Sequence, residues 1–333
     1  MEDLVLSLGQ PRYRAAQIAA WLYKHLASDF KEMHNLPLSL RDRLVEVSEI
    51  GRLTPLEEVS SQDGLTRKVL FSLPDGHTIE SVLMHYKRRH TVCLSTQVGC
   101  PIGCPFCATG QSGFERDLSS GEIVEQVVYF ARELHEAGQR LTNLVFMGMG
   151  EPFLNWEATW KAVQAFTDPS RLGLGARHIT ISTAGFIPGL EALAQKESQV
   201  GLAISLHAAN DKLREILVPL NRRYPLESLM EACQDYVKRT GRRITFEYAL
   251  IEGLNDSASH AQELAGLLSG LLCHVNLIPL NPTVDCAWRG SPRERVLAFQ
   301  RELFKEGVPV TVRIDRGVEI QAGCGQLRSR RGR

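Results

Sequence analysis

The strongest constraint on the fold is a series of short apolar runs, rich in β-branched residues, that alternates with helical stretches from about residue 90 onward. Strands that are almost wholly apolar, each followed by a helix, are typical of a parallel sheet covered by helices. Six repeats are fewer than the eight of a closed barrel, so the pattern predicts an α/β fold built on a partial (β/α)6 barrel. The six runs are residues 91–96, 141–148, 178–185, 201–208, 243–251 and 274–282.

Helices are expected between these runs. Ser119 stands three residues before Glu122, which is the spacing of a capping box, and the helix that follows has apolar residues on one face. Further helices are predicted over residues 156–166, 226–238, 258–271 and 292–305. The barrel core is therefore assigned to residues 89–325.

The first 88 residues have a different pattern of apolar residues. Apolar positions recur at helical spacing in residues 12–26 and 38–47, which predicts a small helical domain over residues 1–50. Residues 51–88 contain short alternating runs broken by Pro74, Asp75 and Gly76, and these indicate a short β-hairpin unit that links the two parts. The basic residues 326–333 are expected to form a disordered tail.

Charge and composition limit the partners. Acidic and basic residues balance at 38 each, so no global field attracts nucleic acid, and an RNA partner would need local basic patches. Such patches occur at residues 86–90, 222–223, 238–243 and 328–333, although each alone is more often a solvated face. The first residues do not resemble a signal peptide, and no apolar run approaches the ~20 residues of a membrane span. We therefore expect a cytoplasmic protein without a membrane partner, in which cysteines are reduced.

Three of the eight cysteines are concentrated in one short loop. Cys100, Cys104 and Cys107 follow the first core run directly, where parallel α/β proteins place their chemistry. A structural zinc site would need four ligands, and no second cysteine or histidine pair follows at ligand spacing. A cubane iron–sulfur cluster normally takes four cysteines, so three would leave one iron open to another ligand. A structural metal knuckle in an RNA-binding protein remains an alternative.

This loop resembles the CxxxCxxC motif of the radical S-adenosylmethionine (SAM) superfamily, with an aromatic residue, Phe106, before the last cysteine. The resemblance implies a 4Fe-4S cluster on the three cysteines, whose open iron binds the amino and carboxylate groups of SAM. It also implies a SAM pocket at the ends of the strands, although residues of these types alone are more often turns and helix caps. The implied SAM contacts are Gly150 and Glu151 in the segment GMGEP, Ser182, the run Ser205, Leu206 and His207, and Asn281.

The segments STQVGCPIGCPFCATGQSGF, GMGEP, SLHA and AGCGQL closely resemble, in the same order, the RlmN/Cfr family of radical SAM RNA methyltransferases. Residues 8–44 also resemble the family's RNA-contacting helical domain. The resemblance implies that Cys324 carries a methyl group, that Cys93 forms a disulfide with Cys324 to release the product, and that Glu80 accepts a proton. Without this resemblance, Cys324 would be interpreted as a cysteine of the C-terminal tail, Cys93 as a buried core cysteine and Glu80 as a solvated carboxylate. Gly323 and Gly325 are expected to make the Cys324 loop mobile.

The implied reaction is methylation of carbon 2 of an adenosine in 23S rRNA, and of an adenosine in tRNA, through an S-methylcysteine intermediate. Two SAM molecules would be used per turnover, and an electron donor such as flavodoxin or ferredoxin would reduce the cluster. We expect a monomer. Two other enzymes remain as alternatives: a Cfr-type enzyme that methylates carbon 8 of the rRNA adenosine, and a radical SAM activase of a partner protein.

Overall fold

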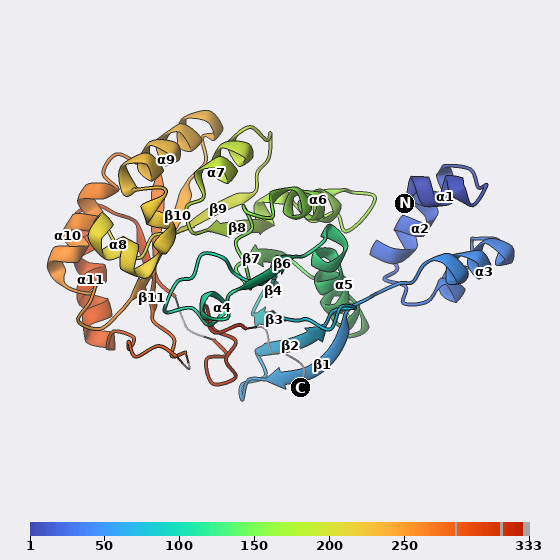
Figure 1. Ribbon diagram of the computed structural model, residues 1–333, viewed down its shortest axis with the longest axis horizontal. Coiled ribbons are helices and arrows are strands. Elements are labelled where there is room, and N and C mark those ends of the chain that lie inside the picture. The colour runs from blue at the N-terminus through green and yellow to red at the C-terminus, as the bar shows by residue number, and fades with distance from the viewer. Residues whose placement is uncertain (284, 314–315, 329–333) are drawn as a thin grey trace.

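The computed structural model describes residues 1–283, 285–313 and 316–328, and it contains one large curved sheet with helices packed along it (Figure 1). Each of the six predicted apolar runs overlaps a strand, and neighbouring strands of this set are parallel. The partial barrel is confirmed. The six strands, in sheet order, are β4 (Arg89–Cys93), β7 (Asn143–Phe146), β8 (Ile179–Thr183), β9 (Gly201–Ser205), β10 (Ile244–Leu250) and β11 (Cys273–Pro279).

The sheet has one more parallel strand than the sequence predicted. Strand β12 (Val310–Val312) pairs with β11 at the edge of the sheet, and its three residues are too short for a recognisable apolar run. The strand order is linear from β1 to β12, so the described strands form an open sheet and the barrel does not close.

The helices on this sheet follow the predicted positions. Helix α5 (Ser120–Glu136) begins at the predicted capping box, in which Ser119 and Glu122 each accept a hydrogen bond from the other's backbone N–H. Helices α6 (Trp156–Thr167), α9 (Leu226–Thr240), α10 (Ala258–Leu267) and α11 (Arg293–Lys305) match the other four predictions within a few residues. Two shorter helices, α7 (Ile187–Ala194) and α8 (Asp211–Leu217), were not predicted.

Residues 51–88 form more than the predicted hairpin. Strands β1 (Thr54–Ser60), β2 (Thr66–Ser72) and β3 (Thr78–Tyr86) make an antiparallel meander, here called the β-extension. Strand β3 then pairs antiparallel with β4, and Val82 lies opposite Cys93. The β-extension is therefore continuous with the core sheet instead of being a separate linker.

The N-terminal residues form a helical unit with a small apolar core of its own. It contains α1 (Glu2–Ser7), α2 (Tyr13–Tyr23), the 3-10 helix η1 (Phe30–Glu32) and α3 (Leu38–Val47). The helix predicted over residues 12–26 ends earlier because Leu26 takes a positive φ of 56°, which a helix cannot accommodate. None of the helices in the described part of the chain is long and apolar enough to cross a membrane.

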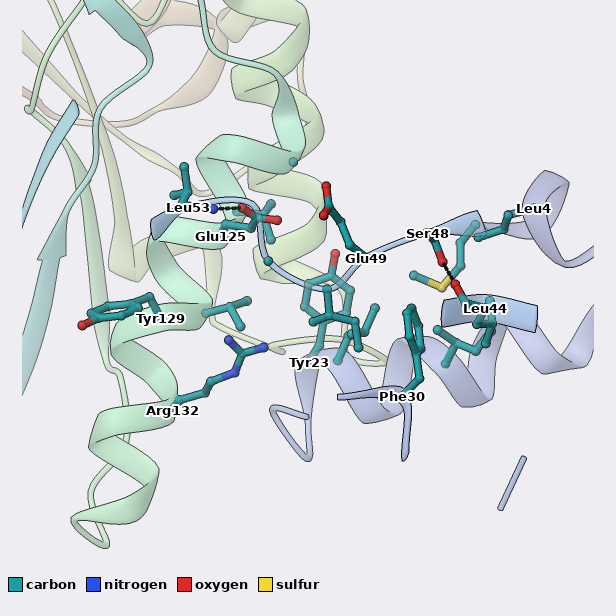
Figure 2. A pocket seen from close by; sticks show the side chains of 18 residues that line it. Leu4, Tyr23, Phe30, Leu44, Ser48, Glu49, Leu53, Glu125, Tyr129 and Arg132 are labelled. Carbon is teal, nitrogen blue, oxygen red and sulfur yellow. Dashed lines mark hydrogen bonds between the residues drawn. The ribbon is translucent and has the colours of Figure 1, made fainter. Parts of the chain in front are cut away.

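Helix α5 holds this N-terminal unit. The Arg132 guanidinium donates to the carbonyls of Leu26 and Ala27 at 2.8 and 2.7 Å, and the Glu125 carboxylate accepts from the backbone N–H of Leu53 at 3.1 Å. Figure 2 shows the mainly apolar cavity that lies between the two units beside these bonds.

The C-terminal residues are ordered further than predicted. Gln326 and Leu327 are buried, and the Thr109 hydroxyl donates a 2.5 Å hydrogen bond to the Leu327 carbonyl. The predicted tail therefore begins too early, and its residues 329–333 lie outside the described residues.

Candidate active site

The three clustered cysteines project from a small hairpin above the end of β4. Strands β5 (Gln97–Gly99) and β6 (Phe114–Asp117) pair antiparallel, and the loop between them carries Cys100, Cys104 and Cys107. The Cys100 N–H donates to Gly113 at 2.8 Å, and the Cys107 N–H donates to Cys104 at 3.1 Å, so the loop is a compact turn. All three cysteines line one cavity.

This cavity lies at the carboxyl ends of the parallel strands, where the sequence pattern placed it. It collects residues that are far apart in the sequence, including Cys324 from the C-terminal loop. Six of the seven predicted SAM contacts line the same cavity: Gly150, Glu151, Ser182, Ser205, His207 and Asn281.

The seventh predicted contact, Leu206, lies in the apolar core. Its side chain is fully buried among core residues, and it is not among the described residues that line the cavity. Its backbone N–H donates to the Glu247 carbonyl at 3.0 Å, and its own carbonyl accepts from Arg214 at 3.2 Å. Leu206 therefore supports the end of β9, and its contact with SAM stays a prediction.

His207 turns the chain at the end of β9. Its φ of 61° is unusual for a residue with a side chain, and its Nδ1 accepts a 2.9 Å hydrogen bond from the backbone N–H of Ala249. Burial, and secondarily the Arg214 charge, lowers the pKa of His207 to about 3, so the ring is neutral at neutral pH. The ring packs edge-on against Phe106 of the cysteine loop.

Glu151 is a buried carboxylate beside the cluster cysteines. Its Oε1 accepts from the backbone N–H of Phe153 at 3.0 Å, and its Oε2 accepts from that of Ala184 at 2.7 Å. Burial raises the pKa of Glu151 to about 7 in spite of these bonds. An ammonium group placed here would favour the ionised form, because an opposite charge nearby stabilises a carboxylate.

The two glycines of GMGEP allow this loop to pack closely against the preceding strand segment. A Cβ on Gly148 would lie 2.6 Å from the Leu94 carbonyl oxygen, and a Cβ on Gly150 would lie 2.6 Å from the Gln97 Cβ. The glycines therefore let this loop pack against the segment that connects β4 to β5. Gly150 also lines the cavity, and its contact with SAM stays a prediction.

Cys324 lies close enough to Cys93 to influence the ionisation of the Cys93 thiol. Burial and, less strongly, the neighbouring Cys324 raise the pKa of Cys93 to about 12, although Arg313 opposes the rise. No disulfide joins any of the eight cysteines, all of which belong to the described residues, so the structure does not support the expected disulfide bond.

The Cys324 loop is held firmly, which differs from the predicted mobile loop. The Asn281 side-chain amide donates to the Cys324 carbonyl at 3.1 Å, and the backbone N–H of Ala108 donates to the Gly325 carbonyl at 2.7 Å. A Cβ on Gly323 would lie 2.7 Å from the Asn281 amide nitrogen, and Gly325 has a φ of +81°. Both glycines therefore serve a tight turn.

Glu80 is not the solvated carboxylate of the alternative interpretation. It is 1% exposed, it lies 3.0 Å from the Lys68 ammonium, and its Oε2 accepts from the backbone N–H of Arg328 at 3.0 Å. It is absent from the described lining of the cavity. Its role as a proton acceptor stays a prediction.

Sequence reasoning missed two charged residues of the cavity, Glu247 and Arg313. Glu247 accepts from the Asn276 amide at 3.0 Å, and burial raises its pKa. The nearby Cys324 and, less strongly, Glu247 and Cys93 raise the pKa of Arg313 above its ordinary value. The sequence does contain a signal for each of them: Glu247 is a charged residue inside the apolar strand ITFEYAL, and Arg313 is a charged residue directly after VTV.

The donor set fits an iron–sulfur cluster. Burial raises the pKa of Cys100 to about 12 and that of Cys104 well above its usual value, so these thiols become thiolates only with a cationic partner. Among the described residues no group of three His, Cys, Asp or Glu side chains is close enough together to bind one metal ion. A cubane cluster does not require such a group, because each thiolate binds a different iron atom.

Comparisons with known proteins agree with this site. The model of the radical SAM superfamily matches residues 94–265, and that of the ribosomal RNA large subunit methyltransferase N-terminal domain matches residues 1–50. The probable dual-specificity RNA methyltransferase RlmN of Moorella thermoacetica is 48% identical, with 98% of this chain and 94% of the relative covered. This chain belongs to the RlmN family of radical SAM RNA methyltransferases.

Two further relatives support the assignment to the RlmN family. The ribosomal RNA large subunit methyltransferase N of Nitrosopumilus maritimus is 49% identical over 99% of this chain and 96% of its own length. The crystal structure of a radical SAM methyltransferase from Sphaerobacter thermophilus matches with a TM-score of 0.96 and 54% identity, covering 98% of this chain and 96% of that chain.

Membership of the RlmN family identifies the protein as a SAM-dependent RNA methyltransferase that uses a 4Fe-4S cluster and SAM. Cys100, Cys104 and Cys107 are the residues that would hold the cluster. The alternatives of an activase and of a non-catalytic RNA-binding protein find no support among these relatives.

Proposed function

We propose that this enzyme methylates carbon 2 of an adenosine in 23S rRNA and of an adenosine in tRNA. One relative is named a ribosomal RNA large subunit methyltransferase, which supports rRNA as a substrate, and another is named a dual-specificity RNA methyltransferase, which is compatible with a second RNA substrate. The observation that carries the proposal is the placement of Cys324 on the same cavity as the three cluster cysteines, with Cys93 close by.

The chemistry of adenine explains why a protein thiol is needed. Carbon 2 is not nucleophilic, so it cannot take a methyl group directly from a sulfonium. Cys324 is proposed to take the methyl first, as S-methylcysteine, at the expense of one SAM. The cluster and a second SAM, when bound, supply the radical chemistry that activates this methyl group.

Release of the product is assigned to Cys93. Its thiolate attacks the Cys324 sulfur and forms a disulfide, while the bond between that sulfur and the methylene carbon on the base breaks. The electron pair of the broken bond stays on that carbon, which takes up a proton to become the methyl group, and a reductant later reopens the disulfide. Arg313 is the cation beside both sulfurs, and it favours their thiolate forms. Glu80 remains the proposed proton acceptor, since it is a carboxylate bonded to the far end of the Cys324 loop.

The partners follow from this reaction. The N-terminal helical unit is proposed to contact RNA, and exposed adenosines in loops are the accessible targets, because RNA presents unstacked bases there. A low-potential donor of the flavodoxin or ferredoxin class would reduce the cluster, and we propose that the enzyme acts as a monomer.

Nucleoside mass spectrometry tests the proposal. Holoenzyme reconstituted without oxygen would be given SAM, a reductant and either 23S rRNA or tRNA, and the digested nucleosides compared with 2-methyladenosine and 8-methyladenosine standards. We expect 2-methyladenosine from both RNAs and none from the Cys324→Ala variant. Formation of 8-methyladenosine would instead establish the Cfr-type alternative, and rRNA-only product would remove tRNA from the proposal.

A further inference from the structure

The loop that carries Cys324 lies on the β-extension. A Cβ on Gly317 would be 2.7 Å from the Thr66 side chain, and further along the loop the Gln321 carbonyl accepts a 3.1 Å hydrogen bond from the Lys68 ammonium. Thr66 and Lys68 are two residues apart on β2, so both side chains stand on one face of the sheet. Figure 1 shows the red C-terminal segment running beside the blue strands β2 and β3.

The neighbouring strand β3 completes this surface. The register places Leu70 opposite Glu80 and Lys68 opposite Val82, so Lys68 and Glu80 are diagonal neighbours on the same face. Their side chains form an ion pair of 3.0 Å and are 4% and 1% exposed.

This single ion pair binds the Cys324 loop at two points. Lys68 binds the Gln321 carbonyl three residues before Cys324, and Glu80 binds the backbone N–H of Arg328 four residues after it. The two bonds use backbone atoms of the loop, so they fix its path without depending on the side chains at those positions. The rigid sheet below therefore sets where the Cys324 sulfur lies.

We propose that Lys68 is a positioning residue that places the Cys324 thiol over the cavity. The inference rests on the proposed role of Cys324 as the methyl carrier, and it assigns a task to the β-extension that the family motifs do not cover. Lys68 is suited to the task because its ammonium has three donors and can bind Glu80 and Gln321 together. Loss of Lys68 would leave the Glu80 carboxylate buried without its cation and would loosen the loop.

A displaced Cys324 has a chemical consequence. Reacting groups must be held close to their productive geometry, and a displacement of about 1 Å can cost on the order of a hundredfold in rate. If the methyl group of Cys324 is out of place, SAM is cleaved without methylating RNA. The expected signature is more 5′-deoxyadenosine formed per methylated adenosine, not merely a slower enzyme.

The first test measures the thiol itself and needs no turnover. Full-length protein without its cluster would be treated with iodoacetamide, and peptide mass spectrometry would compare alkylation of Cys324 with that of Cys286. We expect Lys68→Met to speed Cys324 alkylation severalfold and Lys68→Arg to restore a rate near that of the wild type. The matched control is Arg67→Met, since Arg67 is the next residue on β2 but pairs with Glu58 and Glu133 away from the loop.

A second variant guards against a general folding defect. Lys68→Met combined with Glu80→Leu replaces the ion pair by apolar side chains of similar size, which proteins often tolerate. This double variant also lacks both anchors, so Cys324 alkylation should again be faster while the thermal unfolding temperature stays near that of Arg67→Met. The holoenzyme of Lys68→Met should then show a raised ratio of 5′-deoxyadenosine to methylated adenosine, and Arg67→Met the wild-type ratio.

The inference is overturned if folded Lys68→Met keeps both the wild-type alkylation rate and the wild-type product ratio while the double variant also keeps the wild-type alkylation rate. Failure of the proposed function would give a different experimental result. In that case wild-type Cys324 would never carry a methyl group, and the alkylation rates would still decide whether Lys68 positions the loop.

Discussion

The side-chain amide of Asn281 donates a 3.1 Å hydrogen bond to the backbone carbonyl of Cys324 and thereby joins the end of β11 to the C-terminal loop. The turn is closely packed at this point, because the position of a Cβ on Gly323 is only 2.7 Å from the same amide nitrogen. The contact makes the geometry of the Cys324 loop depend on the core strands.

Gly323→Ala should therefore destabilise the protein by about 1–3 kcal/mol, which is the usual cost of overpacking. Asn281→Ala removes the clashing amide, so the double variant should lose less stability than the sum of the two single variants. Urea unfolding of the four proteins measures this coupling. Strict additivity would show that the loop relaxes away from Asn281.

Cys104→Ala should abolish iron binding, because two thiolates rarely hold a cubane cluster. The measurement is the iron content and visible absorbance of protein reconstituted without oxygen. Cys286→Ala is the matched control, since Cys286 packs against the same apolar cluster as the loop cysteines but lies outside their loop. A full iron complement in Cys104→Ala would refute the ligand assignment.

Cys93→Ala should stop the reaction at its last step. Methyl transfer to Cys324 and attack on adenine do not need Cys93, so RNA should remain covalently attached through the Cys324 sulfur. The adduct should survive a denaturing gel and be missing when Cys324 is also replaced by Ala. Free methylated RNA at the normal rate would reduce Cys93 to a core residue.

His207 should make the protein sensitive to mild acid. Its pKa is lowered from 6.5 to about 3 in the folded state, so this group's contribution to stability is present above pH 6.5 and is lost as the pH falls toward 3. Between pH 6.5 and about pH 5 the loss should be roughly 2 kcal/mol. Denaturant unfolding at the two pH values measures it.

His207→Asn is the appropriate comparison for the acid effect. Asn tolerates the positive φ of this position and offers an oxygen to the Ala249 N–H, but it does not titrate. Equal acid sensitivity in the two proteins would assign the effect to other groups.

Replacing Arg12 and Lys24 by Glu should weaken RNA binding and flatten its dependence on salt, since fewer phosphate contacts release fewer counterions. Both residues are exposed on the N-terminal helical unit. Arg14 is left unchanged because it donates to Gln17 and to the Asn35 carbonyl and so supports the unit itself. When RNA affinity is measured over a series of salt concentrations, the variant should differ most from the wild type at low salt. The same affinities in both proteins would place the RNA-binding surface elsewhere.

Much of the core was readable in the sequence because its strands are apolar runs and its cysteine loop has a specific spacing. The capping box at Ser119 was local and therefore predictable. Strand β12 was missed because three residues carry no pattern, and its pairing with β11 depends on the rest of the sheet.

The site was predictable only as far as motifs extend. Gly150 was recognised as part of a motif, but its close packing against Gln97, about fifty residues earlier in the chain, was not. Lys68 could not be found because its importance arises from Gln321, which is 253 residues away. Contacts between distant backbone atoms leave no mark in a local sequence pattern.

The antiparallel pairing of β3 with β4 also affects behaviour outside catalysis. It keeps β4, the strand that contains Cys93, in the interior of the sheet. The edge strand is instead β1, which is exposed and contains Pro55, the acidic Glu57 and Glu58, and a bulge. Such features discourage strand addition by another molecule. A chain shortened to begin at residue 89 would offer β4 as an uncovered edge, so it is expected to self-associate, and the β-extension thus also protects the enzyme from aggregation.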